Sequence, residues 1–477
     1  MVGPRWFVRA AAFLVLSLGL LPDRVEAQYV YDIRADGVLE WREHLGSLGG
    51  VFDWTLPQAV GSGWGSFLSV FPGEQGVLYA IRADGTLVWY RHDGAPNGSA
   101  RWSGPTDIGN YWQGFKTAFC GGDGVIYALQ NDGVLVWYRH VGWRTGEPQW
   151  EGPQVVGVGW QNFLRVFPGE NGVIYAVAMD GTLSWYRHLG HGDGSFAWDG
   201  PRTIAAGWNG FEKVFTAPGG VIYAIQPDGT LRWHRHVGHL DGSAAWSGPW
   251  TVGTGWLFPS AFAAPVPIEG YAWPLSAAPG ETIDFSMVSP TSFTVTYVGF
   301  HRQGDQNQAT ALTVPQGYSA VLQAVPAQAS ETGCGWTSKF QLTVPAEWPS
   351  GVYAAECADI AGHKFRITFV VKPAPGDHGD FAVLANTNTW NAYNDWGGAS
   401  KYTSPAAHTV SYLRPNPHAA PSDAGGVNHL ARAELWGLDW LSTTGYRFDV
   451  YSDIDFHAGI AGLAGYKGLI LDPPPED

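Results

Sequence analysis

The chain has 477 residues, and its 64 glycines, 32 prolines and 14% aromatic content against only 14% charged residues are typical of turn-rich β structure. This composition excludes a disordered or coiled-coil chain, and the length indicates about two to four domains. The formal net charge of -15 excludes nucleic acid and anionic membrane surfaces as partners, because both need a basic face, and it leaves neutral ligands open.

The first 27 residues have the layout of a secretory signal peptide. Arg5 and Arg9 precede an apolar run at residues 10–21, and the small residue Ala27 marks a cleavage site. The apolar run is about twelve residues long, whereas a helix that spans a bilayer needs about 20, so a membrane anchor is the weaker alternative. We therefore expect a secreted protein with no membrane span once residues 1–27 are removed.

One short motif recurs through the first half of the chain. It begins with an aspartate-glycine turn signal and continues as an alternating strand, as in "DGTLVWYRH". The five copies start at Asp36, Asp84, Asp132, Asp180 and Asp228, with a constant spacing of 48 residues. Four aromatic series keep this spacing: the Tyr31 series (Tyr31, Tyr79, Tyr127, Tyr175, Tyr223), the Trp41 series (Trp41, Trp89, Trp137, Trp185, Trp233), the Trp54 series (Trp54, Trp102, Trp150, Trp198, Trp246) and the Trp64 series (Trp64, Trp112, Trp160, Trp208, Trp256). Such a strict period predicts five copies of one structural unit.

Each unit contains four short β-like runs, such as "FLRVF", "VIYAVAM", "LSWYRH" and "PRTIA", with glycine-rich turns between them. Four strands in a unit of 48 residues are typical of a β-propeller blade. The first unit lacks its first run, and residues 257–263, after the last unit, supply a matching one. We therefore predict a closed five-bladed β-propeller over residues 28–264, which leaves no blade with an unpaired edge.

The motifs "GW..F", "VIYA", "DGTL.WYRH" and "W.GP", repeated at this period over about half of the chain, resemble the tachylectin 2 family of five-bladed lectins. The resemblance implies that the propeller binds glycans with N-acetylated amino sugars at five equivalent sites between neighbouring blades. Five weak sites acting together would raise avidity on a glycan-coated surface.

Several repeated positions are candidates for these sites. The five aspartates precede glycine, so we interpret them chiefly as turn formers and, second, as carbohydrate contacts. The Trp41 series is expected to pack between blades. The Trp64 series stands at strand-entry loops, where packing and an exposed indole that stacks on a sugar are both open, and we name it as carbohydrate-binding. A repeated histidine is expected to be a solvated strand-end residue rather than a metal ligand or pH sensor, at His44, His92, His140, His188 and His236.

Beyond a proline-rich joint, the pattern of the chain changes. Residues 265–375 contain alternating strands such as "SFTVTYVGF" and "KFRITFVV", which predict a β-sandwich. Residues 376–477 predict a partial α/β domain, with a strand, a helix and a strand in βαβ order. The fold class is therefore mainly β. Cys334 and Cys357 either pair as a disulfide or remain buried thiols, and Cys120 stands alone.

The motifs "GYAWPLSAAPGE", "WPSGVYAAE", "NTWNAYNDWGGASKY", "GYRFDVYSDIDFH" and "YKGLILDPPPE" resemble the large-subunit catalytic region of N,N-dimethylformamidase. The resemblance implies hydrolysis of a small amide by a single iron held by two tyrosines and one glutamate. Matched motif by motif, these ligands are Tyr353, Tyr393 and Glu476. Phenolates and a carboxylate are hard oxygen donors suited to iron, which would activate water and polarise the amide carbonyl.

Two further acids, Asp453 and Asp455, follow a predicted strand with His457 close by, and they either line a pocket or form a polar loop. The leading hypothesis joins a secreted glycan-binding propeller to an iron-dependent amide hydrolase. The alternative is a multivalent lectin with a truncated, inactive enzyme remnant, because this chain has "PPPED" where the family sequence has "HPEYW".

Overall fold

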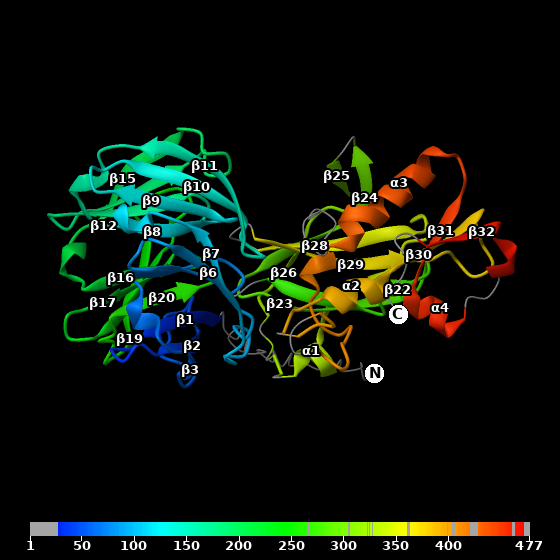
Figure 1. Ribbon diagram of the computed structural model, residues 1–477, viewed down its shortest axis with the longest axis horizontal. Coiled ribbons are helices and arrows are strands. Elements are labelled where there is room, and N and C mark those ends of the chain that lie inside the picture. The colour runs from blue at the N-terminus through cyan, green and yellow to red at the C-terminus, as the bar shows by residue number, and fades with distance from the viewer. Residues whose placement is uncertain are drawn as a thin grey trace, which may run out of the picture.

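The structure is a computed structural model with two lobes, the first half of the chain at left and the second half at right in Figure 1. It describes residues 27–265, 268–303, 306–321, 323, 325–326, 328–359, 363–397, 399–402, 406–419, 428–459 and 463–471. The predicted signal peptide, apart from Ala27, and the predicted ligand Glu476 lie outside these residues. No helix within the described ranges is long and apolar enough to cross a membrane.

The first half folds into five antiparallel sheets of four strands each. Blade 1 contains β20 (Ser260–Ala264), β1 (Ala27–Ile33), β2 (Leu39–Leu45) and β3 (Gln58–Gly61). Blade 2 contains β4 (Ser69–Pro72), β5 (Val77–Ile81), β6 (Leu87–His92) and β7 (Trp102–Gly109). Blade 3 contains β8 (Phe115–Gly122), β9 (Val125–Gln130), β10 (Leu135–Gly142) and β11 (Glu147–Gly157). Blade 4 contains β12 (Phe163–Pro168), β13 (Val173–Ala178), β14 (Leu183–His188) and β15 (Trp198–Ala205). Blade 5 contains β16 (Lys213–Ala217), β17 (Val221–Ile225), β18 (Leu231–His236) and β19 (Trp246–Gly253).

The ring is closed by a strand from the far end of the propeller sequence. β20 pairs antiparallel with β1, with Tyr31 opposite Phe262, so the green β20 lies beside the blue β1 in Figure 1. The first strands of the five blades, β20, β4, β8, β12 and β16, contact one another in turn around the ring. The five-bladed closure predicted from the missing first run is therefore confirmed.

The aspartate-glycine turns join each blade to the loop that enters the next one. In blade 2, a carboxylate oxygen of Asp84 accepts a hydrogen bond from the Thr86 amide at 2.9 Å, and Gly85 takes the positive φ of 88° that the turn needs. The Gly85 carbonyl then accepts from the Trp112 amide at 2.9 Å. The other four turns repeat both contacts. The aspartates are turn formers, as the sequence predicted.

The repeated histidines are buried rather than solvated, which corrects the sequence-based expectation. His140 is fully buried, and its Nδ1 lies 2.9 Å from the hydroxyl of Tyr79 in the preceding blade. Its Nε2 lies 2.7 Å from the Glu147 carbonyl, which can only accept, so Nε2 carries the proton and the Tyr79 hydroxyl donates to Nδ1. The same bond joins every pair of neighbouring blades, as Tyr31–His92, Tyr79–His140, Tyr127–His188, Tyr175–His236 and Tyr223–His44.

The Trp41 series packs at the same seams. These indoles are at most 2% exposed, and the Trp89 N–H, for example, donates to the Trp143 carbonyl of the next blade at 2.7 Å. Gly146 of that next blade lies directly on the Trp89 ring, where a Cβ would come within 2.6 Å of the ring. The glycine of this loop is therefore required by the close approach, and the predicted blade packing is observed.

The second half begins with two packed sheets. The smaller contains β21 (Glu269–Trp273), β23 (Thr282–Val288) and β27 (Ser338–Thr343). The larger contains β22 (Ser276–Ala277), β29 (Lys364–Val371), β28 (Gly351–Asp359), β24 (Phe293–Gln303), β25 (Gln306–Ala311) and β26 (Gln316–Tyr318), and the helix α1 (Ala329–Thr332) lies outside both. One apolar core, which includes Phe285, Phe340 and Phe369, joins the sheets. Cys334 and Cys357 are buried free thiols, so the disulfide alternative is wrong.

A parallel sheet of three strands follows, in the order β31 (Phe448–Ser452), β30 (Phe381–Ala385) and β32 (Gly468–Leu471). Its helices are α2 (Thr387–Tyr393), the 3-10 turns η5 (Pro417–Ala419) and η7 (Leu463–Gly465), the π-helical turn η6 (Leu430–Glu434), α3 (Leu435–Thr443) and α4 (Asp453–Ala458). Val383, Leu435 and Val450 of this unit share a core with Val352 and Val370 of the larger sheet. The predicted βαβ order is observed.

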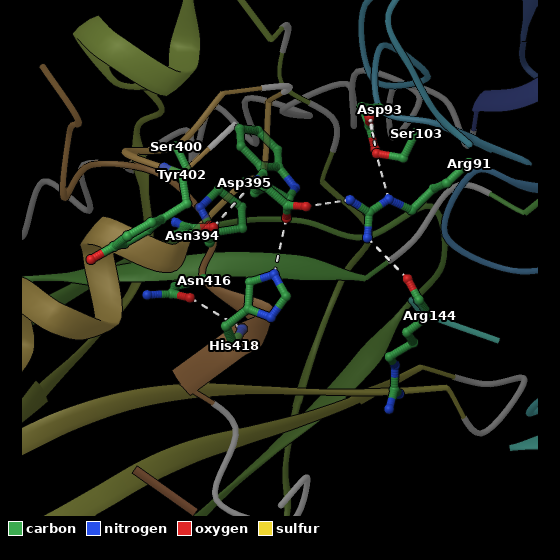
Figure 2. A network of polar contacts seen from close by, with 12 residues as sticks. Arg91, Asp93, Ser103, Arg144, Asn394, Asp395, Ser400, Tyr402, Asn416 and His418 are labelled. Atoms are coloured by element: carbon green, nitrogen blue, oxygen red, sulfur yellow. Dashed lines mark hydrogen bonds and ion pairs between the residues drawn. The ribbon is translucent and has the colours of Figure 1, made fainter. Parts of the chain in front are cut away.

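The two lobes are joined through a loop that follows α2. Arg91 at the end of β6 donates to Asp93 at 2.6 Å and to Asp395 of the second half (Figure 2). The other oxygen of Asp395 lies 2.9 Å from His418. Burial raises the pKa of this carboxyl, but the Arg91 guanidinium and the contact with His418 hold it well below its usual range. Next to it, Trp396 is buried in an apolar cluster that contains Tyr29 of the propeller. Ionic and apolar contacts together fix the loop to blades 1 and 2.

We expect acid to destabilise the propeller through its buried histidines. Burial lowers the pKa of His44, His92 and His140 to about 4 and also lowers the pKa of His188 and His236. An unfolded histidine has a pKa of about 6.5. The unfolded chain therefore takes up protons first, so stability is complete above about pH 6.5 and is lost as the pH falls toward about 4. Denaturant unfolding across this range measures the effect.

A matched pair of variants tests the origin of this loss. Tyr79→Phe leaves His140 Nδ1 buried without a donor and should lower the free energy of unfolding by about 1–3 kcal/mol. Tyr446→Phe removes a hydroxyl from a half-exposed ring in the second half and should change it by less than about 0.5 kcal/mol. Equal effects of both variants, or stability that stays constant down to about pH 4, would contradict the buried-histidine account.

A second prediction concerns the joint between the lobes. Asp395→Asn removes the charge that Arg91 and His418 share, and it should lower stability by about 1.5–3 kcal/mol and separate the unfolding of the two lobes. Asp377→Asn is the control, because its ion pair with Arg447 has both side chains more than 60% exposed. Calorimetry should show one transition for the control and two for Asp395→Asn. A single unshifted transition in both proteins would sink the prediction.

Candidate functional site

The Trp64 series lies at the seams between blades, and its side chains are buried rather than exposed. The five rings are 4–5% exposed. Trp64 is surrounded by Phe67, Tyr90 and Trp102, with ring centroids 4.9–5.6 Å away. The remaining four seams repeat this cluster, with His234 in place of the tyrosine in blade 5 and Arg42 lying over Trp256 at the closing seam. Aromatic packing explains the burial, and stacking of a sugar on an open indole face is not available here.

The indole N–H groups of this series are nevertheless left for a ligand. The Trp54 series differs, because its indole N–H groups donate across the seam. Trp102 donates to the Val60 carbonyl at 2.7 Å, and the other four seams repeat this bond. The N–H groups of the Trp64 series have no partner within the described ranges, and they are not among the fully buried unpartnered atoms. Small residues border each of them, namely Gly61, Gly109, Gly157, Ala205 and Gly253. Each seam thus presents a hydrogen-bond donor at the edge of a rigid aromatic cluster.

Polar groups from the turn and the entry loop surround this donor. The turn of Asp36 lies against the loop of Trp64, because the Gly37 carbonyl accepts from the Trp64 amide at 2.9 Å. One carboxylate oxygen of each aspartate remains outside the turn bond. Three seams add an exposed amide directly after the tryptophan, at Gln113, Gln161 and Asn209, whereas the others have Gly65 and Leu257. A ligand with carbonyl, amide and hydroxyl groups finds both donors and acceptors here.

The two tyrosines predicted as iron ligands lie in separate environments. Tyr353 on β28 points into the core between the two sheets, where it stacks on Trp348 at 5.0 Å, and its hydroxyl donates to the Pro349 carbonyl at 2.7 Å. Burial raises the pKa of this hydroxyl to about 12. Tyr393 ends α2 and packs against Tyr402 at 4.2 Å. Strand alternation turns Tyr353 away from the face of the larger sheet that carries the α/β unit.

The predicted iron site is therefore not formed by the described residues. Tyr353 packs in the core between the two sheets, Tyr393 packs against Tyr402, and Glu476 lies outside the described ranges. Within those ranges, no group of three or more His, Cys, Asp or Glu side chains could hold a metal ion. Tyrosine is not among these four residue types, so Tyr353, Tyr393 and Glu476 stay a prediction for the iron site.

The loop that contains Tyr393 is instead held by a buried arginine that the sequence did not single out. Arg414 is 1% exposed and donates to the carbonyls of Trp396 at 2.6 Å, Asn394 at 2.8 Å and Ala399 at 3.1 Å. Burial lowers the pKa of Arg414 to about 10, so it stays charged at neutral pH. Arg414 belongs to no recognisable sequence motif, so the sequence gave no indication of this role.

Another missed residue is Glu434, in the π-helical turn η6. Its carboxyl accepts from the Trp390 indole at 2.7 Å and from the Asn386 amide at 3.2 Å, and burial raises its pKa to about 8. It lies beside the carboxyl ends of the parallel strands, where ligands of α/β folds bind. The predicted acids at this edge are structural: Asp455 forms a capping box with Ser452, and Asp453 accepts from the Thr387 hydroxyl at 3.0 Å. Both acids thus lie in the first turn of the helix α4 rather than in a loop.

Comparisons with known proteins agree with this division of the chain. Residues 28–106 and 95–265 match the family model described as Tachylectin. Residues 292–476 match the model described as N,N-dimethylformamidase beta subunit-like, C-terminal. A search of the curated proteins found no match.

Solved structures resemble the chain only distantly. One, from work titled "The de novo evolutionary emergence of a symmetrical protein is shaped by folding constraints", has 16% identity and a TM-score of 0.35 and covers 50% of this chain and 99% of its own. The SapL1 lectin in complex with alpha methyl fucoside has 11% identity and a TM-score of 0.25, with coverage of 64% and 96%. These scores carry no functional argument. The family matches show that the chain joins a Tachylectin-like five-bladed propeller to a region like the C-terminal part of the N,N-dimethylformamidase beta subunit.

Proposed function

We propose that the protein is an exported, multivalent glycan-binding protein whose five propeller seams each bind an N-acetylated amino sugar. The observation that carries this proposal is the fivefold free indole N–H of the Trp64 series, at the edge of a packed seam. Support for a sugar as the ligand comes from the match of residues 28–265 to the Tachylectin family.

The chemistry of each seam suits an acetamido sugar. The indole N–H can donate to the acetamido carbonyl, and the second oxygen of the turn aspartate, which at Asp36 already accepts from Arg34, can accept from a sugar hydroxyl or amide. Packing holds the indole in place before the ligand arrives, so little side-chain entropy is lost on binding. The flat edge of a buried ring gives a shallow site, which suits weak binding at each seam.

The seams are not identical, and their differences predict which of them bind an acetamido sugar more tightly. Gln113, Gln161 and Asn209 add amide donors and acceptors at three seams, whereas Leu257 adds an apolar group at the closing seam. We expect the three amide-bearing seams to bind an acetamido sugar more tightly than the seams of Gly65 and Leu257. Avidity on a surface then arises from several seams that engage together.

A single-seam variant tests the role of the indole N–H. Trp160→Phe keeps an aromatic ring in the cluster but removes the donor, so titration calorimetry with N-acetylglucosamine should give one site fewer per chain than the native protein. Trp440→Phe is the control, because Trp440 on α3 is 63% exposed and far from the seams in sequence. Native stoichiometry in Trp160→Phe would refute the indole contact, and no sugar binding by the native chain would refute the function.

Amide hydrolysis by the second half is the second candidate function, and the match of residues 292–476 favours it. The resemblance predicts iron as its cofactor and a small amide as its substrate, but the described residues do not assemble the ligand set. We therefore assign the binding function to the propeller and treat hydrolysis as a separate hypothesis with its own test.

Iron content decides between a hydrolase and an inactive relative. Because the Tyr353 ring is packed in the sandwich core and its hydroxyl donates to the Pro349 carbonyl, we expect the purified full chain to contain far less than one iron per molecule and to lack the visible absorption of an iron-phenolate. Stoichiometric iron that is lost in Tyr393→Phe, with a visible band that disappears with it, would instead establish the metal site and overturn our assignment. Tyr446→Phe, at a half-exposed tyrosine outside the ligand set, serves as the control.

A further inference from the structure

The propeller channel has two unlike ends. A cavity of about 690 Å³ follows the first strands of the blades, and His363 and the start of β29 in the second half line one end of it. There His363 lies 3.4 Å from Glu74 and 2.8 Å from Asp359, and these carboxylates raise the histidine pKa to about 11. The opposite end, where the first strands begin, forms a recess of about 340 Å³ that we call the outer mouth.

The outer mouth gathers positive charge in an acidic protein. Lys116, Arg165 and Lys213 from three successive blades line it, with Glu212 as its one carboxylate. The net charge of the chain is -15, so this cluster runs against the overall balance. Within the described ranges, none of these three cations forms an ion pair with a carboxylate, so their charge is not neutralised locally.

Two of these cations have hydrogen-bonding capacity left over. Arg165 uses one terminal nitrogen, Nη2, to donate to the Glu212 carbonyl at 3.1 Å, but its Nη1 is buried and has no partner. The Lys213 amine makes no hydrogen bond or ion pair within the described ranges. Lys116 differs, because its amine donates to the carbonyls of Gln161 at 3.3 Å and Phe163 at 3.0 Å and so joins two blades. Arg165 Nη1 and the Lys213 amine therefore keep hydrogen-bonding capacity for an acceptor.

We propose that the outer mouth binds a carboxylate or sulfate group of an acidic sugar through Arg165 and Lys213. A guanidinium and an amine on adjacent strands make charge-assisted hydrogen bonds to such a group, and the recess has room for a sugar ring behind it. This site is distinct from the five seams and does not rest on their binding of neutral sugars. Joined with the seam binding proposed above, it would make the propeller prefer glycans that carry both acetamido and acidic groups.

The repeat supplies variants that should fold. The 48-residue period places Thr117 of blade 3 at the position of Arg165 and Lys213, so Arg165→Thr and Lys213→Thr copy a residue that another blade already uses. Calorimetry on the full chain would compare glucuronate, N-acetylglucosamine 6-sulfate, inorganic sulfate and N-acetylglucosamine. N-acetylglucosamine 6-sulfate should bind at one site more than N-acetylglucosamine does, and glucuronate should bind at this one site. The double variant should weaken that site at least about tenfold.

The controls separate this site from general charge and from the seams. Arg447→Gln removes an exposed cation of the second half and should leave acidic-sugar binding unchanged. Binding of N-acetylglucosamine to the seams should be unaffected by the double variant. Acidic-sugar binding that survives the double variant would overturn the proposal, and so would inorganic sulfate that binds as tightly as the sulfated sugar, because the site would then hold a free anion only.

Discussion

Each blade of the propeller is fastened to the next by a buried hydrogen bond from a tyrosine hydroxyl to a histidine ring nitrogen. Tyr79 and His140 show why this bond matters: both are buried, and the opposite nitrogen of the histidine is already committed to a backbone carbonyl. Only a neutral imidazole in one tautomer satisfies both partners. Five such bonds, together with the pairing of β20 and β1, turn five marginal sheets into one closed ring.

This rigid ring positions everything else. The aspartate-glycine turn of one blade and the strand-entry loop of the next are bonded to each other, so the seam that holds Trp64 is set by two blades at once. Arg91 fixes the second half to this ring, because it joins the end of β6 to Asp395 in the loop after α2. The loop of Tyr393 is thus anchored on the propeller side by Asp395 and Trp396, and on its own side by Arg414.

Much of this architecture could be predicted from the sequence because short, local sequence patterns determine it. The 48-residue period, the turn at Asp84 and the missing first run were enough for the five blades and their closure. The burial of His140 was missed because its partner, Tyr79, lies 61 residues away across a seam, and no local pattern shows that pairing. Likewise, motif spacing placed Tyr353 and Tyr393 in one site, whereas strand alternation points Tyr353 into the sandwich core.

The same limit applies to charge. Arg165, Lys213 and Arg414 look like ordinary surface cations in the sequence, and only the fold shows a buried unpaired nitrogen in one and a full set of carbonyl partners in another. Function in this chain therefore depends on contacts between distant segments. A crystal structure of the full chain with N-acetylglucosamine tests the central claim most directly: we expect sugar density at the seams, with an acetamido oxygen within hydrogen-bond distance of the Trp64-series indoles. Density confined to other surfaces, or to the second half, would contradict the account.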